Sequence, residues 1–417
     1  MNPFIAAIKP TLDEEKRVKA VTVSFLKKLN ANLTDATAIL GGSGAKGTWL
    51  SGNHDLDIFV LFPLRKYASR SGELSEIIEP ILEKLFPQQQ LKRVHGSRDY
   101  FQLMYEGFNI EVVPILKIAR AEQAVNITDV SPLHTKWVSA KSAAIKDEIL
   151  LAKQFCKAQS LYGAESYITG FSGYVLEILT SNYGSFEKLL RSSLKWKKNE
   201  VIDVEKHYPH KNALFHLNQS KVRSPLIVID PVDKSRNAAA ALSDEKCLLF
   251  QQKAKEYLTK PSADFFVKKE VLFDSWKADL QRRSHYGAWI RLLMVEGKED
   301  VVGVKIIKII DFLEKELAPF SVLKTGFVWD KSSAVTIYIE VEKKQREGEE
   351  IKPGPPLTLT LFVADFKKKN KDTFVEKDRI MARVKVGKVS LADNLKMALK
   401  KEYVVEKIFS VEDVIIM

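Results

Sequence analysis

Two acidic residues two positions apart are the first candidates for chemistry. Asp55 and Asp57 stand in an apolar stretch that predicts a strand. Because side chains alternate along a strand, both carboxylates would share one face. The residues that would enter a core on the opposite face are Leu56, Ile58 and Val60. Two nearby carboxylates repel each other, and Mg²⁺, which prefers hard oxygen ligands, would relieve that repulsion. The open alternative is the solvated face of an edge strand.

A third acid, Glu111, lies in a second apolar stretch, FNIEVVPIL. Its neighbours Ile110 and Val112 should point away from it, into the core. If this strand pairs with the first, three carboxylates meet on one face. Three carboxylates can hold two metal ions, the arrangement that in-line phosphoryl or nucleotidyl transfer uses.

A glycine-rich turn precedes the two aspartates. Gly41, Gly42 and Gly44 allow backbone N–H groups to approach an anion closely, and Ser43 adds a hydroxyl donor. The segment lacks the Gly-Lys-Ser/Thr ending of a P-loop, and alone it is compatible with an ordinary tight turn. Followed by the Asp-Leu-Asp motif, it indicates a triphosphate site beside a metal site.

The elements around these motifs predict a small α/β unit. Thr11 and Glu14 have capping-box spacing, and the apolar residues that follow recur at helical intervals. Strands are expected at residues 36–40 and 56–62, a helix at 73–85, and a hairpin around residues 106–107. The first 120 residues therefore predict a small α/β unit.

The rest of the chain predicts helical and mixed parts. A helix is expected at residues 141–159, another at 304–317, and paired strands at 327–329 and 335–341. The stretch 342–356 is rich in charge, Pro and Gly and predicts a loop. The predicted division is an α/β part at 1–138, a helical part at 139–258, a third part at 259–350 and a basic C-terminal tail at 351–417.

Charge indicates what such a protein binds. The 417 residues include 65 Lys and Arg against 53 Asp and Glu, so the formal charge is +12, and residues 366–407 hold 13 basic against 6 acidic residues. This pattern is compatible with a solubilising surface or with a surface that binds nucleic-acid phosphates. The candidate RNA-binding residues are Lys367, Lys368, Lys369 and Lys371.

Composition excludes several classes of protein. Two cysteines, Cys156 and Cys247, are too few for a disulfide framework and argue against a cysteine-rich zinc site. No stretch is long and apolar enough for a membrane span, and the first residues lack the pattern of a signal peptide. We therefore expect a cytoplasmic protein without a membrane partner.

Several motifs together carry a resemblance to a known family. Gly42-Ser43 followed by Asp55-Leu56-Asp57, with a third acid on a later strand, resembles the polymerase-β-like nucleotidyltransferase superfamily. The segments SPLHTKWV, YGAESYITGFSGYVLEIL, YGSF and VIDPVDKSRNAAAALS are similar to those of the archaeal class I CCA-adding enzymes. The match runs from about residue 5 to residue 250 and weakens beyond residue 260.

The resemblance implies a reaction and a set of site residues. It implies addition of C, C and A to the tRNA 3′ end from CTP and ATP, with two Mg²⁺ ions held by Asp55, Asp57 and Glu111. It also implies a multi-domain α/β and α+β protein with a polymerase-β-like head, a helical neck, a ferredoxin-like RNA-binding body and a basic tail. The residues expected to bind the nucleotide are Gly42, Ser43, Ser131, His134, Lys153, Tyr162 and Arg236.

Arg236 is the residue expected to select the base. Its guanidinium has five donors and no acceptor, so it suits the acceptor edges of cytosine and adenine, and Asp230 is expected to orient it. The family usually has Glu-x-Asp and a later Asp, so the lengths of two acids are exchanged here. The alternatives are a poly(A) polymerase, an oligoadenylate synthetase-like enzyme or a non-catalytic RNA-binding relative. Whether the protein forms a homodimer is left open.

Overall fold

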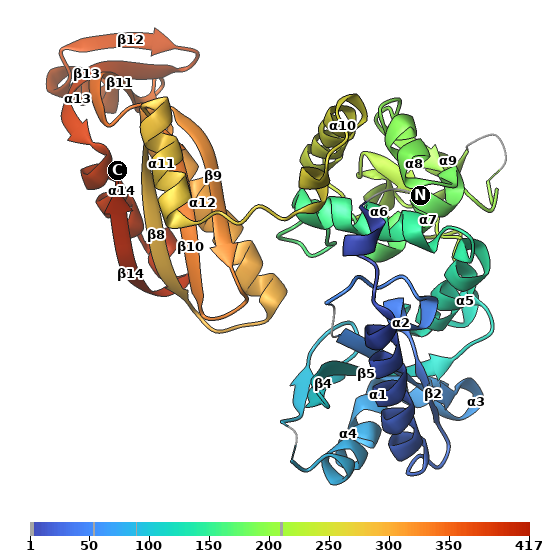
Figure 1. Ribbon diagram of the computed structural model, residues 1–417. Coiled ribbons are helices and arrows are strands. Elements are labelled where there is room, and N and C mark those ends of the chain that lie inside the picture. Colours follow the sequence, from blue (N-terminus) through green and yellow to red (C-terminus); the bar gives the residue numbers. More distant parts are fainter. Residues whose placement is uncertain (1–3, 53–54, 89, 209–211) are drawn as a thin grey trace. The chain divides into compact units, whose positions relative to one another are not determined.

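The chain consists of two compact units, Met1–Lys269 and Glu270–Met417. The computed structural model describes residues 4–52, 55–88, 90–208 and 212–417 (Figure 1). Over these ranges, no helix combines the length and the apolar character needed to cross a bilayer.

The first unit begins with a five-stranded sheet in the order β1-β2-β5-β4-β3. The strands β2 and β5 run parallel, and the other neighbouring pairs are antiparallel. The expected strands and hairpin are therefore confirmed. The strand bounds are β1 Thr37–Leu40, β2 Asp55–Pro63, β3 Lys92–Val94, β4 Tyr100–Tyr105 and β5 Phe108–Lys117.

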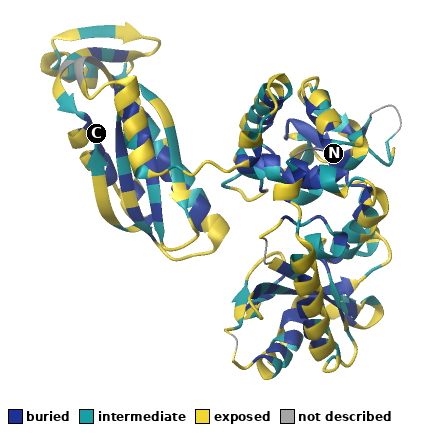
Figure 2. Cartoon of the chain, viewed as in Figure 1, coloured by how far each residue is buried: buried dark blue, intermediate teal, exposed yellow. Residues whose placement is uncertain are grey.

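Helices α1 (Leu12–Asn30) and α4 (Leu74–Leu85) pack on this sheet. The capping box is confirmed, since the Thr11 Oγ1 accepts from the Glu14 N–H and the Glu14 carboxylate accepts from the Thr11 N–H. The apolar side of α1 is buried and its other side faces solvent (Figure 2). The alternating residues Leu56, Ile58, Val60, Ile110 and Val112 are buried in the same core, as expected.

A helical part follows the sheet within the first unit. One helix was expected at 141–159, and this is wrong at its start because the chain turns between α5 (Ser131–Ser142) and α6 (Lys146–Ala158). The local sequence has no Gly or Pro that would indicate this turn. The turn follows from packing, since α5 contacts α2 (Gly42–Lys46) whereas α6 packs against α8. The other elements of the helical part are α7 Gly173–Tyr183, α8 Phe186–Ser193, β6 Glu200–Ile202, α9 Ala213–His216, β7 Leu226–Val228 and α10 Asp244–Thr259; the short α3, Leu64–Tyr67, follows β2 in the sheet part.

The second unit contains a four-stranded antiparallel sheet in the order β14-β8-β10-β9. The predicted helix and the predicted strand pair are confirmed, as α12 and as β9 with β10. Residues Val335, Ile337, Ile339 and Val341 are buried on the face that α12 covers. The bounds are α11 Phe273–Arg283, β8 Tyr286–Met294, α12 Glu299–Leu317, β9 Val322–Trp329, β10 Ala334–Val341 and β14 Ile408–Ile416.

A smaller sheet in the same unit corrects the expected loop at 342–356. Residues Gln345–Pro356 form strand β11, which pairs antiparallel with β13 in the order β11-β13-β12. Charge and proline do not prevent pairing here because β11 is an edge strand. The remaining elements are α13 Thr360–Lys369, β12 Asp372–Glu376, β13 Arg379–Ser390, α14 Leu391–Leu399 and α15 Glu402–Val405.

The four predicted domains are finer than the two units. The predicted boundary between residues 350 and 351 falls inside β11, and β14 returns to pair with β8. Phe266 still packs in the core of the helical part, beyond the predicted boundary at residue 258. The four-part division and the ferredoxin-like body stay predictions.

A buried ion pair fixes the end of the sheet that leads into α5. Asp129 is fully buried and accepts hydrogen bonds from Arg98 and from the backbone N–H groups of Leu116, Val125 and Asn126. Arg98 also donates to the Pro114 carbonyl and to the Ser71 hydroxyl. One carboxylate therefore ties the end of β5 to the residues just before α5.

We expect Asp129→Ala to lower the free energy of unfolding by about 3–5 kcal/mol, because it leaves the Arg98 charge buried without its partner. Urea unfolding followed by circular dichroism measures the loss. The control is Glu83→Ala on exposed α4 surface, which should change stability by less than about 0.5 kcal/mol. Equal unfolding midpoints for Asp129→Ala and the control would refute the structural role of this pair.

Candidate active site

The three predicted acids lie on one face of the sheet. In the parallel β2–β5 pair, Asp57 is opposite Glu111, and Asp55 is opposite Asn109. Their apolar neighbours fill the core on the other face. The expected strand pairing is thus confirmed, and the alternative of an edge strand is excluded, since β2 lies between β1 and β5.

Each acid has a distinct environment. Asp55 is exposed and accepts from the Asn109 side chain at 3.1 Å. Glu111 accepts from the Gln102 amide at 2.7 Å. Asp57 is half-buried. Burial raises its pKa; Lys46 opposes this shift and Asp55 adds to it.

These carboxylates are compatible with a divalent cation. All are hard oxygen donors, and Asp57 is an enclosed carboxylate beside a second one, which a cation would stabilise. Across the described ranges, however, no three His, Cys, Asp or Glu side chains are gathered closely enough to surround an ion. The register places the acids side by side, while Gln102 and Asn109 hold two of them in other hydrogen bonds.

Gly42 is required at the glycine turn. Its φ is +53°, and a Cβ there would lie 1.6 Å from the Asp57 Oδ2. The N–H of Gly41 donates to the Asp57 carbonyl at 2.7 Å. Residues 42–44 of the expected turn form the start of α2, which includes Ser43, and Gly41 precedes the helix as its N-cap. Backbone of the turn therefore touches the Asp57 carboxylate directly.

A buried ion cluster joins the sheet to the helical part. Glu177 on α7 is fully buried, and its Oε2 accepts from Lys46 at 2.7 Å. Its Oε1 accepts from Thr48 at 2.6 Å and from Lys153 at 2.7 Å. Burial alone would raise the pKa of Glu177, but Lys153 and Lys46 hold it below its ordinary value.

Lys153, expected at the triphosphate, is 3% exposed. Besides Glu177, its ammonium donates to the Thr48 carbonyl at 2.9 Å and to the Thr48 hydroxyl at 3.1 Å. An ammonium has three N–H donors, so these three contacts use all of them. Burial lowers the pKa of Lys153, and Glu177 opposes that shift.

Tyr162 lies next to this cluster. A Cβ on Gly173 would lie 2.6 Å from the Tyr162 hydroxyl and 3.6 Å from the Lys153 Nζ. Burial raises the pKa of Tyr162. Lys157, one turn beyond Lys153 on α6, places its Nζ 5.2 Å from the centre of the Tyr162 ring.

A second cluster is built around Asp230, which is fully buried. Its Oδ2 accepts from Arg236 at 2.7 Å and lies 3.0 Å from the His134 Nε2, while its Oδ1 accepts from the Tyr174 hydroxyl at 3.0 Å. Burial would raise the pKa of Asp230, but His134, Arg236 and the Val232 N–H hold it at about 2. The expected Asp230–Arg236 contact is confirmed, and His134 joins it.

Ser131 is the first residue of α5, the helix that carries His134 and contacts α2. The structure therefore brings the glycine turn against Asp57 and places Tyr162 beside the Glu177 cluster, while Ser131 is linked to them only through the contact between α5 and α2. The predicted tail lysines lie in the second unit, at the exposed C-terminal end of α13, where Lys369 pairs with Asp365 at 2.7 Å.

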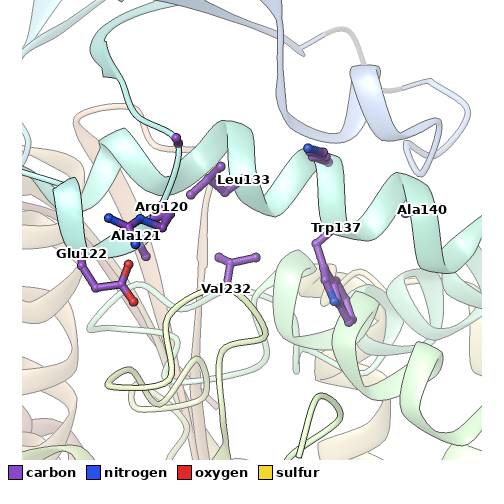
Figure 3. A pocket seen from close by; sticks show the side chains of 9 residues that line it. Arg120, Ala121, Glu122, Leu133, Trp137, Ala140 and Val232 are labelled. Carbon is purple, nitrogen blue, oxygen red and sulfur yellow. The ribbon is translucent and has the colours of Figure 1, made fainter. Parts of the chain in front are cut away.

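A pocket of about 410 Å³ lies against the face of α5 that carries Leu133 and Trp137, not His134 (Figure 3). Leu133, Trp137 and Ala140 line it from the helix, and Arg120 and Val232 close it. None of the three acids lines this pocket. Val232 connects it to the Asp230 cluster, because the Val232 N–H donates to the Asp230 Oδ1.

Sequence reasoning missed Lys46, Lys157, Tyr174 and Glu177. Glu177 carries a signal that could have been used, since it is a lone acid within the apolar run GYVLEILT. Lys157 follows Lys153 at helical spacing. The pairing of Lys46 with a residue 131 positions away leaves no mark in the local sequence.

Two families match the chain. One described as "Nucleotidyltransferase domain" matches residues 22–103, and one described as "tRNA nucleotidyltransferase, second domain" matches residues 147–267. A solved structure of the Cid1 poly(U) polymerase with MgGTP has a TM-score of 0.50 at 16% identity and covers 64% of this chain and 96% of that one. That likeness concerns the fold alone.

Several curated relatives carry the name "CCA-adding enzyme". The one from Nanoarchaeum equitans is 38% identical, with 88% of each chain covered. Those from Sulfolobus acidocaldarius and Sulfurisphaera tokodaii are 31% and 30% identical, covering 89% and 98% of this chain and 84% and 94% of theirs. The chain belongs to the family of CCA-adding enzymes.

Proposed function

We propose that this protein adds C, C and A to the 3′ end of tRNA from CTP and ATP, without a nucleic-acid template. The observation that supports this most is the register that places Asp55, Asp57 and Glu111 on one face beside Gly42. The relatives named CCA-adding enzyme supply the substrate class.

In this proposal the three acids hold two Mg²⁺ ions. When bound, such ions lower the pKa of the attacking 3′-hydroxyl and stabilise charge on the phosphates. The chain itself positions the reactants. Gly42 lies against the Asp57 carboxylate, and we propose that the N–H groups of the Gly42–Ser43 segment and the Ser43 hydroxyl contact the triphosphate.

We further propose that Arg236 reads the base and that Ser131 and His134 contact the incoming nucleotide. Arg236 bonds Asp230 through one nitrogen, and its side chain is 31% exposed, so other donors of the guanidinium can face a base. Asp230 holds His134 and Arg236 in fixed relative positions.

The direct test is to incubate the protein with a tRNA that lacks its terminal CCA and to sequence the 3′ ends. We expect CCA when CTP and ATP are both present and CC with CTP alone. Asp57→Asn should reduce turnover by several factors of ten, each worth about 1.4 kcal/mol of barrier, and should leave tRNA affinity intact. A growing run of A would identify a poly(A) polymerase, and no pyrophosphate release from the wild type would identify a non-catalytic protein.

Arg236→Ala should raise the use of UTP and GTP relative to CTP and ATP. Loss of a base-edge contact removes about 1–3 kcal/mol of discrimination, which corresponds to about 5-fold to 150-fold. The fold should survive, because Asp230 keeps His134, Tyr174 and the Val232 N–H as partners. Competition among the four nucleotides measures the effect. Unchanged nucleotide ratios would mean that Arg236 only completes an ion pair.

The lysines at the C-terminal end of α13, with Lys371 just beyond it, should act through tRNA phosphates. Each phosphate contact adds about 0.7–0.9 to the slope of log affinity against log salt. Changing Lys367, Lys368, Lys369 and Lys371 to Gln should therefore weaken full-length tRNA binding and flatten its salt dependence. Maximal turnover at saturating tRNA should hold.

A matched control for these lysines removes the same charge from the first unit. It changes four exposed lysines to Gln: Lys188, Lys195, Lys197 and Lys198. Equal loss of affinity in both variants would indicate a general effect of net charge, and no loss in either would indicate a solubilising surface.

A further inference from the structure

The carboxylate of Glu14 on α1 accepts hydrogen bonds from two separate segments of the chain. Its Oε2 accepts from the Thr11 N–H at 2.7 Å, which belongs to the capping box. Its Oε1 accepts from the Gly52 N–H at 2.9 Å, and the Ser51 hydroxyl donates to the two oxygens at 2.9 Å and 3.0 Å. The backbone bonds from Thr11 and Gly52 are the main cause of a pKa for Glu14 of about 2. A capping box needs only the Thr11 contacts, so the others link α1 to a distant loop.

This loop joins the glycine turn to the strand of the acids. Near its start, Thr48 belongs to the buried ion cluster. Leu50 is buried in the core of the helical part, and the Ser51 N–H donates to the Ile8 carbonyl at 3.0 Å. The first part of the loop is therefore fixed by the helical part, and the Glu14 carboxylate holds its later residues from the side of α1.

Asp55 is the acid whose backbone has the least support from the sheet. It is the first residue of β2 and is exposed. Strand β1 pairs with β2 only from Ile58 onward, so at Asp55 the strand has a partner on one side only, which is β5. Strand ends with few partners open locally at a low cost in free energy. Gly52 lies three residues before Asp55, so fixing Gly52 restricts where β2 can begin.

We propose that Glu14 is a positioning residue for the transfer reaction, which clamps Ser51 and Gly52 to the first turn of α1 and thereby holds the Asp55 end of β2 in place. This rests on the proposed nucleotidyl transfer. The clamp requires a carboxylate, because both oxygens accept from backbone N–H groups. An amide of the same shape has one acceptor oxygen, and its NH₂ would face the second N–H donor.

Variants that separate the clamp from the helix cap test this assignment. Glu14→Gln should lower turnover at saturating CTP, ATP and tRNA about 10-fold to 100-fold, because a small displacement of a reacting group costs about that much. The KM for CTP should change far less, because the residues proposed to contact the nucleotide lie outside the clamp. Ser51→Ala should lower turnover to a smaller extent, since the Gly52 contact remains, and should keep its thermal midpoint.

Two further variants are the controls. Thr11→Ala removes the Oγ1 that accepts from the Glu14 N–H but spares the clamp, so it should lower the thermal midpoint and keep turnover. Glu15→Gln removes the same charge from the same turn of α1, where Glu15 is exposed, and should change neither quantity.

Hydrogen exchange gives a readout that does not depend on catalysis. In Glu14→Gln, the amides of residues 55–58 should exchange faster than in the wild type, while those of α4 should not change. The proposal is overturned if that exchange is unchanged, or if Glu14→Gln and Ser51→Ala turn over as Glu15→Gln does. It is also overturned if Thr11→Ala loses as much turnover as Ser51→Ala, which would assign the effect to the cap. A wild type that extends no tRNA would refute the proposed function, and the exchange rates would still decide whether Glu14 holds the start of β2.

Discussion

The ion pairs of the Glu177 carboxylate with Lys46 and Lys153 are the interaction on which the rest of the first unit depends. The carboxylate lies between Lys46, at the end of the glycine turn, and Lys153, on a helix of the other part. Removing one member would leave a buried charge unpaired, so the three side chains are fixed together. This polar contact therefore aligns the sheet that carries the acids with the helices that carry the proposed nucleotide contacts. Its hydrogen bonds form in only one geometry, whereas apolar packing alone allows small shifts between the two parts.

The same principle recurs at Asp230. One fully buried carboxylate orients a histidine, a tyrosine and an arginine that come from three separate segments. The His134 and Tyr174 rings lie 4.1 Å apart, centre to centre, which restricts both further. In each cluster an enclosed acid organises cationic or donor groups, and at Asp230 the partly exposed Arg236 side chain therefore keeps a fixed direction. Such preorganisation is what a site needs if it is to stabilise charge without reorganising during a reaction.

Local patterns were sufficient for the sheet and the acids. Alternation predicted that Asp55 and Asp57 share a face, and the capping box at Thr11 predicted where the first helix begins. Long-range contacts were not predictable in the same way. The Lys46–Glu177 pair and the turn between α5 and α6 depend on packing between distant segments. Strand β11 was missed because its composition is that of a loop, and its pairing with β13 decides its conformation.

The last strand, β14, pairs with β8 across a separation of more than a hundred residues. Closing so long a loop carries a large entropic cost, and contacts of this kind slow folding. During synthesis on the ribosome, the second unit would therefore stay incomplete until its final residues emerge, while the first unit can already have folded. A truncated chain without β14 would leave β8 with an unpaired edge, which favours association with other chains. The order of synthesis thus makes the first unit available before the second unit can close its sheet.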